Sequence, residues 1–197
     1  MTPLLALVGL AAGLGLLAIV AWRLVRARSS RVAVRAPFAL PVDAQRLALT
    51  LTSGLEHAPA CRYGQTTLAL AADGSLGLEM RRGGQRACWE GRVTPAARAR
   101  LLGALREAGF PAPRPPKGPA PAIRPGQTFD TLVVVGAGDD GASGSLTMDA
   151  NELRFDAVYG PAWALLACLT KQVSAGEVGY GDAALLPDAV EAARRTA

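Results

Sequence analysis

The central part of the chain alternates between apolar and polar positions with a period of two, which is typical of a β-strand with one buried face. The first such run begins at Arg46, and the next two flank Asp73-Gly74, a strong hairpin signal. A fourth run follows Gly83-Gly84 and places Arg, Cys and Glu on its polar face. The inward positions of these four predicted strands are Leu47, Leu49 and Leu51; Leu68 and Leu70; Leu76, Leu78 and Met80; and Ala87, Trp89 and Val93.

Two segments instead carry apolar residues at helical spacing. The first follows Thr94-Pro95, an N-cap residue and a proline at the first helical position, and runs up to Gly109. The second opens at Gly160-Pro161 and has Lys171 in its last turn. We expect both helices to lie on the apolar face of the sheet.

The second half of the chain predicts further strands. Residues 129–135 form a strongly apolar strand, and Leu146 and Met148 supply its partner across a turn. Leu153 and Phe155 alternate with charged residues, which favours another short strand. Residues 175–197 read as a Gly-rich joint and an Ala-rich segment of uncertain order.

These elements predict an α+β domain over residues 46–175, followed by a C-terminal tail over residues 176–197. Its mostly antiparallel sheet has about six strands, with two helices on one face. A stiff loop interrupts the domain, because residues 110–127 contain seven of the 14 prolines.

The N-terminus has a different pattern. Residues 3–22 carry no charge, and twenty helical residues span about 30 Å, so we expect a transmembrane anchor over residues 1–22. The alternative is a cleaved signal peptide, but a basic n-region and a small-residue cleavage site are missing. Residues 23–45 then form a basic juxtamembrane linker.

The charge distribution predicts the orientation of this anchor. Five arginines follow the apolar segment, and the rest of the chain carries 16 basic and 16 acidic residues. The folded domain should therefore face the cytoplasm, and its neutrality argues against nucleic-acid binding. The residues expected to contact anionic lipid headgroups are Arg23, Arg26, Arg28, Arg31 and Arg35.

Two motifs suggest protein partners. Gly9 and Gly13 form a G-x-x-x-G in the apolar segment, a spacing that allows two membrane helices to pair as a homodimer. Residues 113–116, Pro-Arg-Pro-Pro, form a P-x-x-P that could dock on an aromatic groove of a partner protein.

The sequence offers no recognisable catalytic, cofactor-binding or metal-binding residues. Residues 136–141 match G-x-G-x-x-G, but two aspartates and a following strand pattern favour a hairpin turn. His57 reads as an exposed loop residue, and without a C-x-x-C spacing the three cysteines do not predict a metal site. The default for the C-terminal acidic residues is a solvated turn and strand edge; they are Asp139, Asp140, Asp149, Glu152 and Asp156.

Cys61 and Cys88 are candidates for a disulfide if the domain lies outside the cytoplasm, because one is predicted in a loop and the other on the polar face of a strand. In the cytoplasm both would stay reduced. The pair therefore reports on membrane topology.

Several short segments together resemble a small bacterial domain family of unknown function, found in secreted, lipid-anchored or membrane-tethered proteins. The matching segments are residues 61–63, 68–74, 91–94, 101–110 and 159–161. The resemblance implies a fold and a cell-envelope setting, and it keeps an extracytoplasmic domain open as the alternative. It transfers no functional residue.

We therefore expect a single-pass membrane-tethered protein whose soluble domain is a non-catalytic binding or structural module. The alternative is an enzyme or enzyme inhibitor with a site built from scattered polar residues. A deep pocket with converging polar groups would favour that alternative, and a flat sheet face would not.

Overall fold

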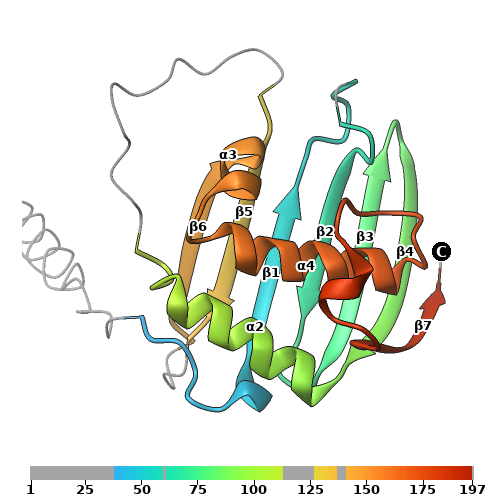
Figure 1. The fold of residues 1–197 in the computed structure, drawn as a ribbon. Helices are drawn as coiled ribbons and strands as arrows, with labels where there is room; N and C mark the ends of the chain where they lie inside the picture. Colours follow the sequence, from blue (N-terminus) through green and yellow to red (C-terminus); the bar gives the residue numbers. More distant parts are fainter. Residues whose placement is uncertain (1–37, 60, 113–126, 137–140, 197) are drawn as a thin grey trace, which may run out of the picture. The chain divides into compact units, whose positions relative to one another are not determined.

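The computed structural model describes residues 38–59, 61–112, 127–136 and 141–196. Within these residues, seven antiparallel strands form one sheet in the order β6-β5-β1-β2-β3-β4-β7, and three α-helices accompany them (Figure 1). The strands are β1 (Ala48–Ser53), β2 (Gln65–Leu70), β3 (Ser75–Arg82), β4 (Gln85–Val93), β5 (Phe129–Val135), β6 (Ser143–Asp149) and β7 (Val190–Arg195). The helices are α2 (Pro95–Glu107), α3 (Ala150–Phe155) and α4 (Gly160–Val173), with short 3₁₀ turns η1 (Ala44–Arg46) and η2 (Ala183–Leu185).

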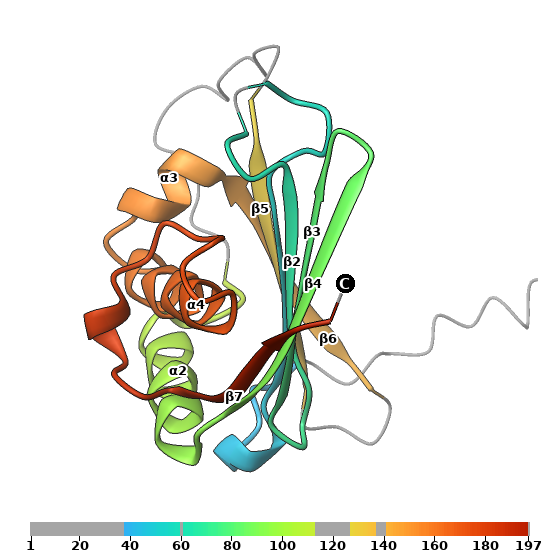
Figure 2. The same cartoon turned by 90° about the vertical axis from the view of Figure 1, so that its right-hand side faces the viewer.

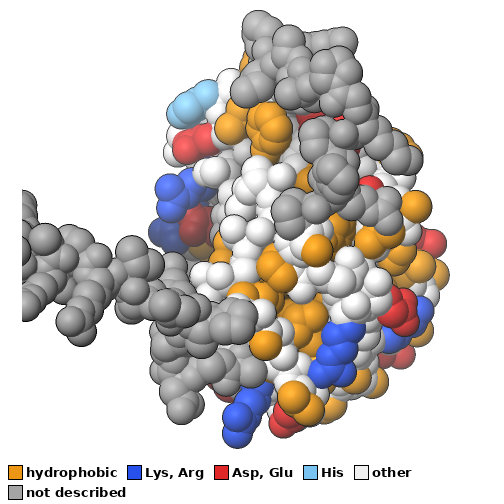
Figure 3. All heavy atoms as spheres, turned by 90° about the vertical axis from the view of Figure 1, so that its left-hand side faces the viewer, with side chains coloured by type: hydrophobic (Ala, Val, Ile, Leu, Met, Phe, Trp, Pro, Cys, Tyr) orange, Lys and Arg blue, Asp and Glu red, His pale blue; other side chains and the backbone are white. Residues whose placement is uncertain are grey.

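The predicted α+β class and antiparallel sheet are confirmed. The helices lie on one face of the sheet, and no described element covers the other face (Figure 2). The core lies between the two layers and is rich in leucine from both. Figure 3, a view from the β6 side, shows charged side chains along the uncovered side of the sheet.

The four N-terminal strands and the two main helices form where the pattern predicts them. β2 and β3 are joined by a hairpin whose turn holds Gly74 at φ +88°, and β4 buries Ala87, Trp89 and Val93. Helix α2 begins at the Thr94 N-cap, whose side chain accepts a hydrogen bond from the Ala97 N–H.

Two predictions for the second half are wrong. The segment with Leu153 and Phe155 is not a strand but helix α3. Its N-cap is Asp149, whose carboxylate accepts hydrogen bonds from the backbone N–H groups of Asn151 and Glu152. Asp149 with Glu152 three residues later is a helix-start signal that outweighs the alternation.

The sheet also has seven strands, not about six, because the C-terminal segment adds β7 beside β4. Val178, Leu186 and Ala189 are buried and hold this segment against α4. Gln172 fixes its path, donating to the Leu186 carbonyl and accepting from the Val190 N–H at 3.2 Å. The tail predicted over residues 176–197 thus contributes core residues and an edge strand.

Packing also extends upstream of the predicted start at Arg46. Phe38 and Leu40 pack against the core, and the Phe38 ring contacts the Phe110 ring edge-to-face at 6.0 Å. A Cβ at Gly144 would lie 2.8 Å from the Phe38 ring, so a larger residue there would displace this ring.

Candidate functional site

A cleft of about 680 Å³ opens at one end of the helix-covered face. It lies where β1 ends and β2 and β5 begin, and α3, α4 and residues 178–180 form its walls. Its volume falls in the range of small-molecule sites. Its polar lining includes Ser53, Thr66, Gln127, Asp130, Asp149, Asn151, Glu152, Arg154 and Thr170.

The carboxylate at the base of the cleft belongs to Asp130, whose residue is fully buried. Strand register places it opposite Ser53, and the Ser53 hydroxyl donates to its Oδ1 at 2.6 Å. The indole N–H of Trp163 on α4 donates to Oδ2 at 2.7 Å. Both oxygens therefore have a donor, and the carboxylate holds a strand and a helix together beneath the cleft.

Burial raises the pKa of Asp130, because the charged form loses its hydration. The hydrogen bonds from Ser53 and Trp163 act in the opposite direction, and the negative charge of nearby Asp149 raises the pKa further. The surroundings of Asp130 therefore oppose the ionisation of its carboxyl group.

Aromatic rings form part of the cleft walls. Tyr63 and Tyr180 contact each other edge-to-face with ring centroids 4.9 Å apart, and Trp163 lines the cleft from α4. Burial raises the pKa of the Tyr180 hydroxyl, so this phenol stays neutral at physiological pH. The rings give the cleft an apolar surface beside its polar groups.

The acidic groups of the outer cleft form no ion pair with a cation among the described residues. Asp149 accepts from Gln127 Nε2 at 2.7 Å and caps α3, while Glu152 is exposed one turn into that helix. Neither forms an ion pair within the part of the chain that the structure describes. The guanidinium of Arg154 instead lies over the rings of Phe155 and Trp163, at 5.3 and 6.0 Å from their centroids.

Glycines allow the strands and loops at this end to approach closely. Gly54 has φ +78°, and a Cβ there would lie 2.2 Å from the Gly64 carbonyl oxygen. Gly64 has φ +65°, and its Cβ would meet the Arg81 carbonyl at the same distance. Both positions therefore require glycine, and both line the cleft.

The structure separates the cysteines and the histidine that the sequence analysis considered. Cys61 is buried and lines the cleft, Cys88 is half-buried on the uncovered face, and Cys168 is buried in α4, where burial raises the pKa of its thiol. His57 is an exposed loop residue, as predicted. No three described His, Cys, Asp or Glu side chains are close enough to hold a metal ion.

Cys61 and Cys88 are free thiols. Cys88 alternates with the buried Ala87 and Trp89, so its side chain points away from the face that contains Cys61. The disulfide considered from the sequence is therefore not formed in this structure, and the intervening sheet is the physical reason.

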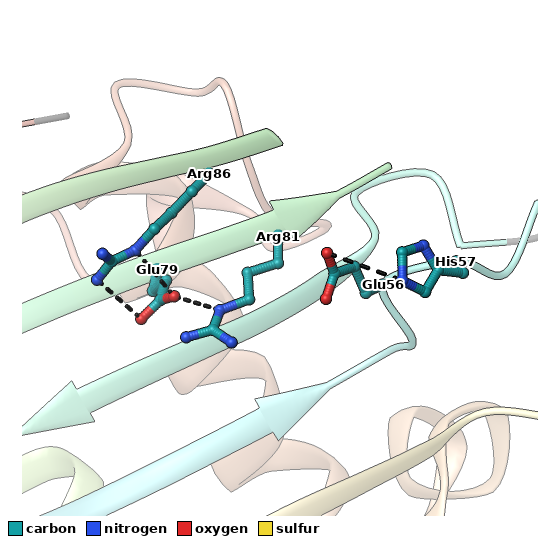
Figure 4. Close-up of polar contacts among 5 residues, drawn as sticks. All are labelled: Glu56, His57, Glu79, Arg81 and Arg86. Carbon is teal, nitrogen blue, oxygen red and sulfur yellow. Dashed lines mark hydrogen bonds and ion pairs between the residues drawn. The ribbon is translucent and has the colours of Figure 1, made fainter. Parts of the chain in front are cut away.

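The uncovered face carries a cluster of ion pairs. The Glu79 carboxylate accepts from Arg81 and from Arg86 Nε at 3.1 Å, while His57 contacts Glu56 at 4.0 Å on the neighbouring loop (Figure 4). The hydrogen bond from Arg81 lowers the pKa of Glu79. The arginines and His57 are exposed and the glutamates half-buried, and ion pairs at such a surface contribute little to stability.

The other motifs lie outside this end of the molecule or outside the described residues. Gly136 and Gly141 flank the β5–β6 connection, and the Gly136 N–H donates to the Ala142 carbonyl. Strands β5 and β6 pair antiparallel on either side of it, so the predicted hairpin is confirmed, and the connection leads into a strand rather than the helix that a dinucleotide-binding motif would require. The acidic pair 139–140, the P-x-x-P at 113–116 and the segments 3–22 and 23–35 fall outside the described residues.

Sequence reasoning did not single out Asp130, Ser53 or Trp163. The alternation along the strands carried a signal. Asp130 lies two residues before the buried Leu132 and therefore faces the same side of the sheet, and Ser53 lies two residues after the buried Leu51. A polar residue at an inward position marks a buried polar contact. Asp149 ends strand β6 and Glu152 is exposed, in line with the predicted solvated strand edge, but the sequence did not show that both line a cleft.

No protein-family profile matches the chain, and no curated protein matches it in sequence. No helix within the described ranges is long and apolar enough to cross a membrane. Function is therefore inferred from the cleft.

Proposed function

We propose that residues 38–196 form a binding module that holds a small ligand in the cleft between β1, β5, α3 and α4. The observation that carries this proposal is the cleft itself, in which polar side chains converge beside three aromatic rings. A concave, partly apolar pocket with a few oriented polar groups is the usual form of a ligand site. The domain would present this site from a membrane tether.

Binding requires only this geometry, whereas catalysis requires an activated group that can reach a substrate. Asp130 is fully buried behind its two hydrogen-bond donors, and the Cys61 thiol is buried whereas His57 is exposed. A cleft with converging polar groups is the feature expected to favour an enzyme, and it keeps that alternative open. The burial of Asp130 and of the Cys61 thiol is the reason we propose binding rather than catalysis.

Neighbouring threonines on β2 give a direct test of the site. Thr66 lines the cleft, while Thr67 points to the uncovered face. The probes are 3-phenylpropyltrimethylammonium, 3-phenylpropanol and 3-phenylpropanoate, whose binding is measured by ligand-observed NMR and calorimetry. We expect Thr66→Trp to fill the cleft and abolish their binding, while Thr67→Trp leaves binding unchanged. Circular dichroism confirms that both variants fold, and Ala167→Leu fills the cleft from α4 if Thr66→Trp does not. Failure of all these compounds to bind the wild-type protein would refute the proposal.

The alternative function is an enzyme that uses the Ser53 hydroxyl, because its hydrogen bond to Asp130 provides a proton acceptor for a nucleophile. A fluorophosphonate probe tests this, since attack by Ser53 Oγ on phosphorus expels fluoride and transfers the hydroxyl proton to Asp130. Labelling of Ser53 found by mass spectrometry and lost in Asp130→Asn would support the enzyme. An unlabelled wild-type protein would leave binding as the better account.

The membrane tether is a separate proposal. Residues 3–22 would span the bilayer, with the arginines of 23–35 against anionic headgroups and the module in the cytoplasm, or outside it in the alternative topology. Cys88 is the suitable reporter because it is the half-buried cysteine, the other two being buried. An impermeant thiol reagent that labels Cys88 only after lysis supports the cytoplasmic side, with Cys88→Ser as the control. Labelling in intact cells supports the outside.

Two protein contacts are further proposals. Helix pairing through Gly9 and Gly13 predicts weaker self-association in membranes for Gly13→Leu, and unchanged association would refute it. A partner at the proline-rich segment predicts that deletion of residues 111–125 removes a protein from a pull-down. Retention of every partner would refute that contact.

A further inference from the structure

We infer that the cleft takes a ligand with an organic ammonium group joined to an apolar portion. This inference rests on the proposed binding function and adds the chemical class of the ligand.

The first observation is the charge of the lining. Two accessible carboxylates, those of Asp149 and Glu152, line the outer cleft with one guanidinium, that of Arg154, while the Asp130 carboxyl is buried behind its two donors. Neither Asp149 nor Glu152 forms an ion pair with a cation that the structure describes, and Arg154 lies over aromatic rings. The cleft therefore has an uncompensated negative charge, which a cationic ligand would offset.

The second observation is the aromatic surface beside these carboxylates. Tyr63, Trp163 and Tyr180 line the same cleft, and rings of this kind attract cations through their electron-rich faces. Two arginines already use such contacts here, since the Arg62 guanidinium lies 5.3 Å from the Tyr63 centroid and Arg154 lies over Trp163. An ammonium group can contact both the rings and the two carboxylates, whereas an anion would meet one guanidinium, that of Arg154, and would be repelled by the carboxylates.

Size and spacing favour an organic cation over a metal ion. A cleft of about 680 Å³ holds an apolar group as well as a charged head. The described acidic side chains do not converge into a metal-binding cluster. An ammonium ion needs no fixed coordination shell, so spaced carboxylates and rings are sufficient.

Three compounds with one skeleton and different charge provide the test: 3-phenylpropyltrimethylammonium, 3-phenylpropanol and 3-phenylpropanoate. We expect calorimetry and ligand-observed NMR to give at least about ten-fold tighter binding for the ammonium than for the alcohol, with the carboxylate weakest. Thr66→Trp should abolish binding of the ammonium.

Matched charge variants locate the effect. Asp149→Asn with Glu152→Gln should reduce the preference for the ammonium to less than about three-fold, and the fold should survive because asparagine is an equally good N-cap. The control pair Glu107→Gln with Glu191→Gln removes the same charge from exposed positions outside the cleft and should leave the preference unchanged.

The outcomes separate this inference from the proposed function. Equal binding of the ammonium and the alcohol, blocked by Thr66→Trp, would leave the binding module standing and overturn the ammonium specificity. A preference for the ammonium that survives Thr66→Trp, or that the control pair reduces equally, would mean general surface attraction and would also overturn it. If none of the three compounds bound, both the proposed binding function and the ammonium specificity would be refuted.

Discussion

The helix-covered face buries a charged side chain at each end, and the two charges serve different purposes. Arg98 on α2 is almost fully buried and donates to the carbonyl oxygens of Gln45 and Ala72, the latter at 2.7 Å. Asp130, at the other end, accepts from Ser53 and Trp163 beneath an open cleft. A buried charge therefore does not by itself mark a functional site. The space next to Asp130 is what distinguishes the two ends.

The Arg98 end is a clamp between α2, η1 and the β2–β3 turn. Its guanidinium also donates to the Gln45 side chain at 3.2 Å, while its Nε lacks a partner among the described atoms. Three acceptors from two distant segments thus depend on one side chain. The comparison predicts that this end governs stability and that the Asp130 end governs binding.

The largest expected effect is therefore that of Arg98→Met. The variant removes three charge-assisted hydrogen bonds from a buried guanidinium to Gln45 and Ala72, which should lower the free energy of unfolding by about 2–4 kcal/mol in urea denaturation. Arg106→Met is the matched control on the same helix, because Arg106 is exposed and its contacts to the Pro41 and Val42 carbonyls should be worth less than about 1 kcal/mol. Equal losses in the two variants would contradict the clamp.

The next effect is that of Asp130→Leu. Loss of the carboxylate leaves the Trp163 indole N–H and the Ser53 hydroxyl without their acceptor, which should cost about 1–3 kcal/mol. Asp130→Asn is the control, because an amide can accept from Trp163 and donate to Ser53, so its loss at neutral pH should be below about 1 kcal/mol. A leucine variant as stable as the asparagine variant would show that these hydrogen bonds contribute little.

The pH dependence sharpens the same comparison. Because the pKa of Asp130 is raised in the folded protein, the native state holds this proton more tightly than the unfolded chain. Holding this proton stabilises the folded state in full when the pH is below about 3.8, the ordinary pKa of an aspartate in the unfolded chain. This stabilisation is lost as the pH rises through the higher pKa of Asp130 in the folded protein. The stability of the wild type relative to Asp130→Asn should therefore fall as the pH rises from about 4 towards neutrality. A constant difference in urea denaturation across that range would argue against the raised pKa.

Much of this architecture follows from local pattern, and the cleft does not. Alternating leucines and the Thr94-Pro95 and Gly160-Pro161 starts predict four strands and two helices, because these elements depend on their own residues. Strand β7 could not be predicted that way, since it has no alternating pattern and gains its conformation from Gln172 and from pairing with β4. The cleft depends on residues distant in sequence, Ser53, Asp130 and Trp163, which only the tertiary fold brings together.

The smallest expected effect concerns the segment that forms the wall of the cleft behind Tyr180. Ala175 follows α4 in the left-handed region at φ +51°, where an alanine side chain is strained, and Gly176 closes the turn by donating to the Lys171 carbonyl at 2.8 Å. Ala175→Gly should raise the free energy of unfolding by about 0.5–1 kcal/mol without changing ligand affinity, because Ser174 still accepts from the Val178 N–H and keeps the wall in place. Ala183→Gly in η2, where no left-handed residue is present, is the control and should not stabilise. If Ala175→Gly instead weakened binding of the ammonium probe, the wall of the cleft would depend on strain at this turn, and the separation between a stabilising end and a binding end would fail.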